Sequence, residues 1–341
     1  MIPFSVLDLC PIVQGATAAQ AFRNSLDLAQ HAERWGYKRF WVAEHHSIQG
    51  ISSAATSVVL AHIGAGTKTI RIGSGGIMLP NHAPMLIAEQ FGTLESLYPG
   101  RIDLGLGRAP GSDQATSQAL RRHPGAGDDF PQDVGELLHW FAPEAEGQAV
   151  VAVPGAGLSI PLWILGSSTW GAQFAAVNGF PFAFASHFAP QQMLAALELY
   201  RSRFKPSEWL DKPYAMLGVN VFAAATDEEA QLLYTSRQQS TLAIRFGRRG
   251  LLPPPVKDFD KTLSAMERAV LEESRPGAIV GGPESVKQGL AKFIARTGAD
   301  ELIIAAQIYD HAARLRSYEL AAQLRQEMAA TEEAGNKAAA A

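Results

Sequence analysis

Short apolar segments alternate with longer amphipathic ones along most of the chain. The apolar segments are rich in β-forming residues or glycine, and such runs are typical of strands that are buried on both faces. They are residues 4–10, 39–45, 70–79, 102–107, 161–166, 180–186, 214–224 and 301–308. Several segments between them have helical periodicity, including one that ends at Gly36 and one that ends at Pro99-Gly100.

This order predicts an α/β fold in one domain. About eight strands separated mostly by helices favour a (β/α)₈ barrel of the TIM type over an open sheet, because helices must cover the outside of the strands. A barrel of this type needs about 250 residues, whereas the chain has 341. The excess predicts insertions after strands four and seven, in residues 109–160 and 227–298. We expect the domain to cover residues 1–330 and residues 331–341 to form a frayed tail.

Charge and cysteine content exclude several classes of partner. The chain has 29 Lys and Arg against 33 Asp and Glu, which gives no strong field for nucleic acid or an anionic membrane. Cys10 is the single cysteine, so an internal disulfide is excluded and a reducing compartment is favoured. The N-terminus does not resemble a secretory signal, and no apolar run approaches about 18 residues. We expect a cytoplasmic protein that binds neither nucleic acid nor membrane.

Polar residues follow several predicted strands at the point where each strand ends. In a barrel these ends meet at one face, where active sites lie. In chain order, the residues are Glu44-His45-His46, Gly75-Gly76 with Asn81-His82, Arg108, Ser167-Ser168 and Ser186-His187. The sequence therefore predicts a functional site at the C-terminal mouth of the barrel.

Arg108 and Ser168 could form part of a phosphate site. A helix is predicted to begin near Ser168, and the free N–H groups at a helix N-terminus bind anions. Arg108 leaves the neighbouring strand, and its guanidinium suits bidentate phosphate binding. The alternatives are a serine that only caps the helix and an arginine that only pairs with Asp113 at the surface.

The histidines and glycines leave more than one interpretation open. Glu44-His45-His46 could ligate a metal, stabilise the structure or contact a cofactor or substrate, and adjacent residues at a strand end point in opposite directions. A metal-dependent barrel hydrolase that uses His45, His46 and His187 remains an alternative, although no clean ligand spacing emerges. Glycines in residues 70–80 indicate either a β-bulge or the close approach of a flat ligand.

Five segments together resemble the bacterial luciferase-like flavin monooxygenase family, and within it the MsnO8-like oxidoreductases. They are WVAEHH at 41–46, GSGGIMLPNHAP at 73–84, GRIDLGLGRAPGSDQ at 100–114, LGSSTWGAQFAAVNGFPFAF at 165–184 and GADELIIAAQIYDHAARLRSYELAA at 298–322. No one segment is decisive, but their order is specific. The resemblance covers most of the chain.

The resemblance implies a TIM-type barrel that binds FMN at its C-terminal mouth. His45 matches the family's active-site histidine, next to the reactive edge of the flavin. Gly75-Gly76 matches a non-prolyl cis peptide behind the isoalloxazine ring. The cofactor-binding residues implied are Glu44, Gly75, Gly76, Arg108, Ser167, Ser168 and Gly171, with the phosphate at Arg108 and Ser168.

The implied activity is oxidation of a small organic substrate by reduced FMN and O₂. Gly107 stands where light-emitting members have cysteine, so light emission and an aldehyde substrate are not expected. An F420-dependent oxidoreductase and a non-catalytic flavin-binding protein are the alternatives within the same fold. We expect a separate flavin reductase, because no nicotinamide site is visible, and a homodimer, because relatives often form one.

Overall fold

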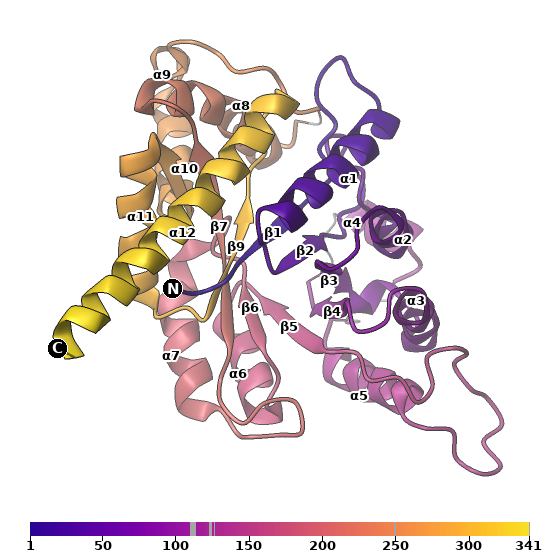
Figure 1. The fold of residues 1–341 in the computed structure, drawn as a ribbon. Coiled ribbons are helices and arrows are strands. Elements are labelled where there is room, and N and C mark those ends of the chain that lie inside the picture. Colours follow the sequence, from indigo (N-terminus) through magenta and orange to yellow (C-terminus); the bar gives the residue numbers. More distant parts are fainter. Residues whose placement is uncertain (110–113, 123–124, 126, 249, 341) are drawn as a thin grey trace.

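Eight parallel strands close a barrel in the computed structural model, which describes residues 1–109, 114–122, 125, 127–248 and 250–340 (Figure 1). The barrel strands are β1 (Phe4–Asp8), β2 (Arg39–Val42), β3 (Arg71–Met78), β4 (Ile102–Gly107), β5 (Leu162–Gly166), β6 (Phe182–Phe184), β7 (Ala215–Ala223) and β9 (Glu301–Ala305). Each of β1 to β6 pairs with its successor, β9 lies between β1 and β7, and the pairing of β6 with β7 closes the ring. The predicted (β/α)₈ barrel is confirmed.

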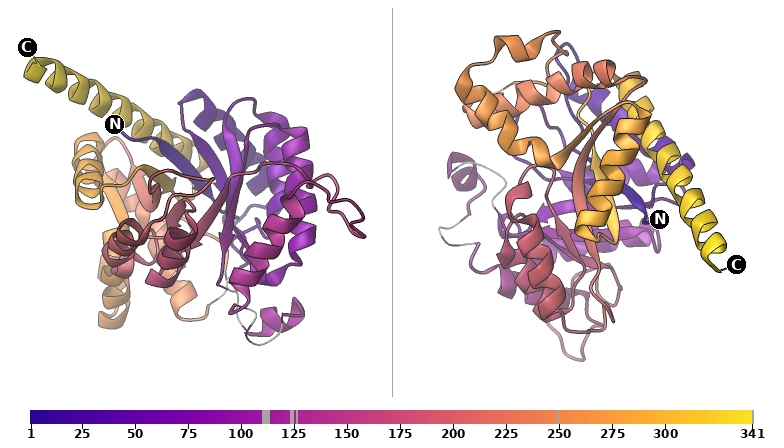
Figure 2. Two further views of the ribbon diagram at one scale, coloured as in Figure 1. Left: turned by 90° about the horizontal axis from the view of Figure 1, so that it is seen from below. Right: turned by 90° about the vertical axis from the view of Figure 1, so that its left-hand side faces the viewer.

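The longer helices surround the barrel, as the two views in Figure 2 show. They are α1 (Ala18–Arg34), α2 (Thr56–Gly66), α3 (Pro84–Leu97), α5 (Phe130–Phe141), α6 (Thr169–Asn178), α7 (Met193–Arg203), α8 (Asp227–Arg245), α10 (Ala265–Ser274), α11 (Pro283–Thr297) and α12 (His311–Ala340). Side-chain caps fix several helix starts: Thr17 accepts the N–H of Gln20, and Thr226 that of Glu229.

Two long connections occur where insertions are expected. The first, between β4 and β5, contains the short α4 (Gln114–Ala119) and α5. The second, between β7 and β9, contains α8, α9 (Phe259–Thr262), α10 and α11. It also contains β8 (Ala278–Gly281), which pairs with the last residues of β7 and which the sequence analysis missed.

The last helix differs from the expectation of a frayed tail after residue 330. The backbone of residues 331–340 continues α12. This segment is rich in alanine, which has the strongest intrinsic helix propensity. Tyr318, Leu324 and Met328 bury the earlier turns of α12 against the barrel.

A network of ion pairs closes the end of the barrel where the strands begin. The buried Arg39 donates from Nη1 to Asp103, at 2.6 Å, and from Nε to Glu301, at 3.0 Å. Above it, the indoles of Trp41 and Trp163 pack edge to face with centroids 5.3 Å apart. Because charges and rings fill this end, a ligand can enter the barrel only at the C-terminal mouth.

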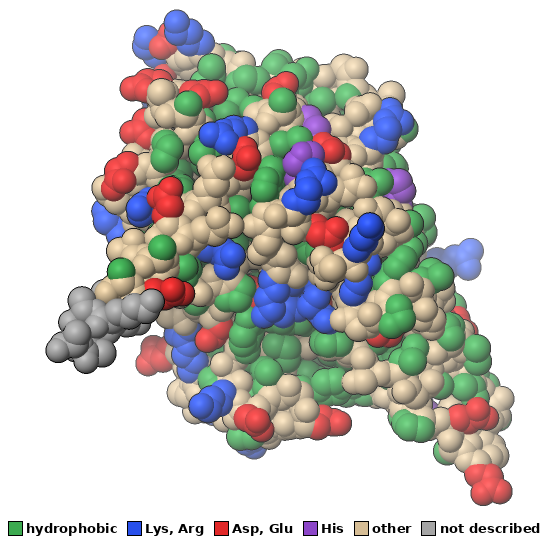
Figure 3. Space-filling model, in the orientation of Figure 1, with side chains coloured by type: hydrophobic (Ala, Val, Ile, Leu, Met, Phe, Trp, Pro, Cys, Tyr) green, Lys and Arg blue, Asp and Glu red, His purple; other side chains and the backbone are tan. Residues whose placement is uncertain are grey.

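The outer surface carries mixed charge. Figure 3 shows Lys and Arg side chains interspersed with Asp and Glu on the face it presents. None of the described helices is long and apolar enough to span a membrane.

Candidate active site

One cavity of about 430 Å³ at the C-terminal mouth brings together most of the predicted site residues. Those that line it are His45 after β2, Gly75 in β3, Arg108 after β4, and Ser167, Ser168 and Gly171 at the junction of β5 and α6. They are far apart in the sequence and meet because parallel strands present their ends at one rim. Glu44 and Gly76 lie directly behind this wall.

The junction of β5 and α6 forms a polar end of the cavity. Ser168 is the N-cap residue of α6, but its side chain makes no capping hydrogen bond. The alternative of a serine that only caps the helix therefore has no support. Because the N-terminal N–H groups of a helix bind anions, this junction suits a phosphate.

Two arginines and one carboxylate, Asp128, line the cavity as well. The Arg108 guanidinium lies over the ring of Trp170, 4.2 Å from its centroid, and this contact fixes its position. Arg122, in the connection that contains α4, lines the same cavity and was not singled out in the sequence. Burial lowers the pKa of Arg122, although a guanidinium stays charged. Asp113, the alternative partner of Arg108, lies outside the described residues.

The remainder of the wall is largely apolar. Its aliphatic and aromatic side chains include Leu7, Leu9, Trp41, Ala43, Met78, Leu165, Ala183, Phe184 and Ile303. The Gly75–Gly76 peptide bond is cis. A Cβ at Gly75 would lie 2.7 Å from Cδ1 of Leu7, so a larger residue would displace the Leu7 side chain. Bare backbone beside apolar side chains, with a phosphate site at the other end, fits a flat ring that carries a phosphate.

Glu44 holds the loops behind the cavity and is fully buried. Its carboxylate accepts the N–H of Met78 at 2.9 Å and lies 2.6 Å from Nε2 of His46 and 3.0 Å from Nε2 of His82. Its own N–H donates to the carbonyl of Gly76 at 3.2 Å. Glu44 and His45 therefore point in opposite directions, as expected for neighbours at a strand end. Glu44 positions the wall rather than lining it.

We expect Glu44→Gln to destabilise the fold by about 3 kcal/mol, because a buried carboxylate with several donors is lost. Burial raises the pKa of Glu44, but hydrogen bonds from His82, His46 and the Met78 N–H bring it below its ordinary value. A carboxylate with a lowered pKa contributes its stability above the unfolded pKa, about 4.3, and loses it as the pH falls further. Urea unfolding at pH 7 and at pH 4 measures this, and the difference from wild type should shrink at pH 4.

The exposed Glu146 provides the matched control. Glu146→Gln should unfold like wild type at both pH values. A Glu44→Gln protein as stable as wild type at pH 7 would contradict the positioning role.

No metal-binding group was found in the described part of the chain, where no cluster of three or more His, Cys, Asp or Glu could hold an ion. The structure also separates the three histidines of the hydrolase alternative. His45 and His187 line the cavity, whereas His46 pairs with Glu44. That alternative therefore has no assembled ligand set.

His187 faces the cavity without a hydrogen bond to Nδ1 from any described residue. Burial is the main cause that lowers its pKa to about 3, and the neighbouring Arg237 and His45 lower it further. It is therefore neutral at physiological pH. The sequence analysis placed His187 after a predicted strand but considered only a metal-binding role for its side chain.

Comparison with known proteins decides the family. Residues 2–301 match the family model described as luciferase-like monooxygenase. The chain belongs to this family. It is 53% identical to a luciferase-like monooxygenase of Escherichia coli K12, over 96% of this chain and 98% of the relative.

Two further members of the luciferase-like monooxygenase family are informative. The crystal structure of apo-MsnO8 is 34% identical, with a TM-score of 0.84 over 96% of this chain and 99% of that one. The N-acetyl-S-alkylcysteine monooxygenase of Bacillus subtilis 168 is 32% identical, over 94% of this chain and 97% of the relative. The same fold recurs at 20% identity in a Baeyer–Villiger monooxygenase in complex with FMN, and at 13% in an F420-dependent secondary alcohol dehydrogenase.

Proposed function

We propose that this chain is an FMN-dependent monooxygenase that uses reduced FMN and O₂ to oxidise a small organic substrate. The observation that carries the proposal is one cavity that combines Arg108, Arg122 and the start of α6 with an apolar wall, and that has His45 in its lining. Family membership supports the class of reaction.

Each end of the cavity suits one part of the cofactor. Arg108, Arg122 and the N–H groups at the start of α6 would hold the phosphate, with Ser167 and Ser168 as further donors. The apolar wall would bind the ring beside the backbone of Gly75. Bound in its reduced form, the flavin would supply two of the four electrons that reduce O₂, and the substrate would supply the other two as it is oxidised.

The remaining chemistry belongs to the side chains around the ring. The imidazole of His45 can hold a proton near the reacting oxygen and pass it on, which is the usual role of histidine in acid and base catalysis. Water must be kept from this step. The apolar wall does this inside the barrel, and the segment that contains α8 forms the next layer outward.

A reduced-flavin assay tests the proposal. Purified protein should bind FMN, and with FMNH₂ it should consume O₂ in proportion to an added organic substrate. An N-acetyl-S-alkylcysteine is the first substrate to try, because a relative is named for that activity. Binding of F420 in place of FMN, or flavin binding with no response to any substrate, would refute the proposal in favour of one of its alternatives.

We further propose a separate reductase as the source of FMNH₂ and a homodimer as the assembly. Exposed hydrophobic side chains on one side of the barrel support the dimer. They are Val58 on α2, Leu86 and Leu97 on α3, and Val150 and Val153 in the segment before β5. Gly155 of that segment packs against the backbone of Ala88, so the segment lies beside α3.

A further inference from the structure

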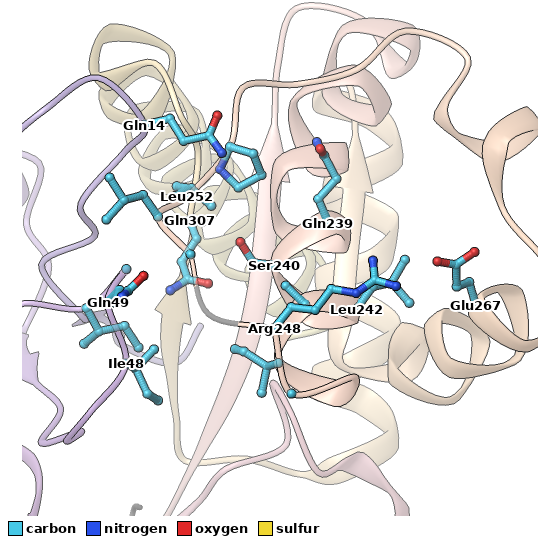
Figure 4. Close-up of a pocket in the computed structure, with 18 of the residues that line it drawn as sticks. Gln14, Ile48, Gln49, Gln239, Ser240, Leu242, Arg248, Leu252, Glu267 and Gln307 are labelled. Atoms are coloured by element: carbon cyan, nitrogen blue, oxygen red, sulfur yellow. The ribbon is translucent and has the colours of Figure 1, made fainter.

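A second cavity of about 800 Å³ lies at the C-terminal mouth and has no part in the proposed function so far. Its wall includes residues of the loop 46–51, of α8 and of the segment 250–253 that follows α8 (Figure 4). His46 lines it and the adjacent His45 lines the flavin cavity, so the two cavities lie on either side of this dipeptide. We call it the outer cavity.

The outer cavity lies on the half of the mouth away from the phosphate end. Its wall comes from segments that follow β1, β2, β7 and β9, and these strands are neighbours in the barrel. Arg108 and Ser168, which suit the phosphate, follow β4 and β5 on the other half. The proposed ring site beside Gly75 belongs to β3, which lies between β2 and β4. A substrate that reaches the ring from the side opposite the phosphate would therefore keep its other groups in the outer cavity.

Hydrogen bonds hold the wall of the outer cavity together. In the loop after β1, Ile12 donates its N–H to the carbonyl of Gly50 at 3.0 Å. The N–H of Leu252, after α8, donates to the carbonyl of Ile12 at 2.9 Å. Gln239 of α8 donates from Nε2 to the carbonyl of Pro254, also at 2.9 Å. Because the helix and the three segments are joined in this way, the cavity is formed before a ligand binds, as is usual for small-molecule sites.

Three side-chain amides in this wall are unpaired among the described residues. Gln14, Gln49 and Gln307 line the cavity (Figure 4), and none of their amide groups hydrogen-bonds to another residue in the part of the chain that the structure describes. Gln14 and Gln49 are exposed, whereas Gln307, two residues after the end of β9, is partly buried. An amide donates through its nitrogen and accepts through its oxygen, so this side of the cavity offers both kinds of hydrogen bond to a ligand.

The two charged side chains that line the outer cavity among the described residues, Arg248 and Glu267, offset each other. Hydrogen bonds from the N–H and the hydroxyl of Ser264 lower the pKa of Glu267, and the positive charge of Arg248 lowers it further. Both side chains are exposed, and the Arg248 guanidinium points to the side where Glu267 lies, away from the three glutamines (Figure 4). His46 has its Nε2 2.6 Å from the Glu44 carboxylate. The described wall therefore offers no unmatched charge to a ligand, and an ion that entered it would lose hydration without gaining a counter-ion of its own.

We infer that the substrate of the proposed reaction carries an uncharged amide, and that Gln307 and Gln49 bind this group. Two amides are complementary to each other, because each donates from nitrogen and accepts at oxygen. Ile48 and Leu252, which line the same part of the cavity, contact the carbon skeleton next to the amide (Figure 4). The end of the molecule that is oxidised extends past His45 to the flavin. This inference rests on the proposed function and adds the substrate class.

The test uses three thioethers that differ only in their polar end. Isothermal titration measures binding of (benzylsulfanyl)acetamide, (benzylsulfanyl)acetate and S-benzylcysteamine to purified protein, with and without FMN. Wild type should bind the amide roughly tenfold more tightly than either ion, because both ions would lose hydration in a wall that offers no unmatched charge. Tightest binding of the anion would assign the ligand to Arg248, and tightest binding of the cation would assign it to Glu267. Either result would overturn the inference.

Gln307→Leu should bind the amide about tenfold more weakly than wild type, because it loses a partly buried hydrogen-bonding partner. Gln307→Glu has the same size but a negative charge, so it should move the preference to S-benzylcysteamine. Gln49→Leu changes an exposed position, where folding is not at risk, and should weaken binding of the amide by a smaller factor.

Gln288→Leu is the matched control. Gln288 is exposed on α11, donates to Glu284 at 3.0 Å and does not line the cavity, so its loss should leave all three affinities unchanged. A preference for the amide that survives both Gln307→Leu and Gln49→Leu would overturn the inference. No binding of the amide at millimolar concentration would overturn it as well.

The flavin assays separate this inference from the proposed function. If FMNH₂ and O₂ are consumed in response to another substrate while the preference for the amide is absent, the substrate class is wrong and the proposed function stands. If the preference is present but FMN does not bind, the proposed function fails and only the amide site stands.

Discussion

Arg108→Ala should weaken FMN binding roughly 30-fold, which corresponds to about 2 kcal/mol. The guanidinium is held over Trp170 at the end of the cavity that suits a phosphate, so its removal takes away a charge-assisted contact to that group. Riboflavin has the same ring without the phosphate. Its affinity should therefore be the same for Arg108→Ala and for wild type.

Quenching of flavin fluorescence measures both affinities. Arg203→Ala is the control, because Arg203 is an exposed arginine at the end of α7 and does not line the cavity. An equal loss of FMN and riboflavin affinity in Arg108→Ala would mean that the cavity itself had collapsed. Unchanged FMN affinity would show that the phosphate lies elsewhere.

His45→Ala should lower substrate oxidation about 100-fold while FMN affinity stays within a factor of two or so. The imidazole follows β2, which β3 separates from the strand that Arg108 follows, so it should act on the reacting oxygen and not on the phosphate. Without a group that controls this proton, reduced flavin and O₂ should release hydrogen peroxide in place of oxidised substrate. The ratio of H₂O₂ formed to O₂ consumed measures the change.

The exposed His139 on α5 supplies the control for this variant. His139→Ala should show the same ratio as wild type. If His45→Ala also keeps that ratio, the histidine has no part in proton transfer and only shapes the cavity.

The barrel could be predicted because most residues of its strands are buried. A strand such as β7, in which all nine residues are buried, produces an apolar run that stands out from its neighbours. The strand β8 produces no such signal, since it has four residues, three of them only partly buried. The helical conformation of residues 331–340 was not predicted, for another reason. The segment has no apolar pattern, which indicates that it does not pack against the barrel, but its alanines still favour a helix.

The candidate site was predictable where residues follow strands directly. Arg108 and Ser168 stand at strand ends, and topology alone brings strand ends together. Arg122 lies in a long connection, whose path over the mouth depends on packing between residues far apart in sequence. The structural role of Glu44 could not be predicted from the sequence either. Its partner His82 is 38 positions away and approaches it only in the folded protein.

The barrel is closed at the end where its strands begin, and this has a kinetic consequence. Arg39, Asp103 and Glu301 block that end, so cofactor, oxygen and substrate share one entrance. A flavin ring bound beside Gly75, inside the barrel, would lie behind any substrate that enters after it through the same mouth. Turnover should therefore follow a compulsory order, in which the flavin enters first and leaves last.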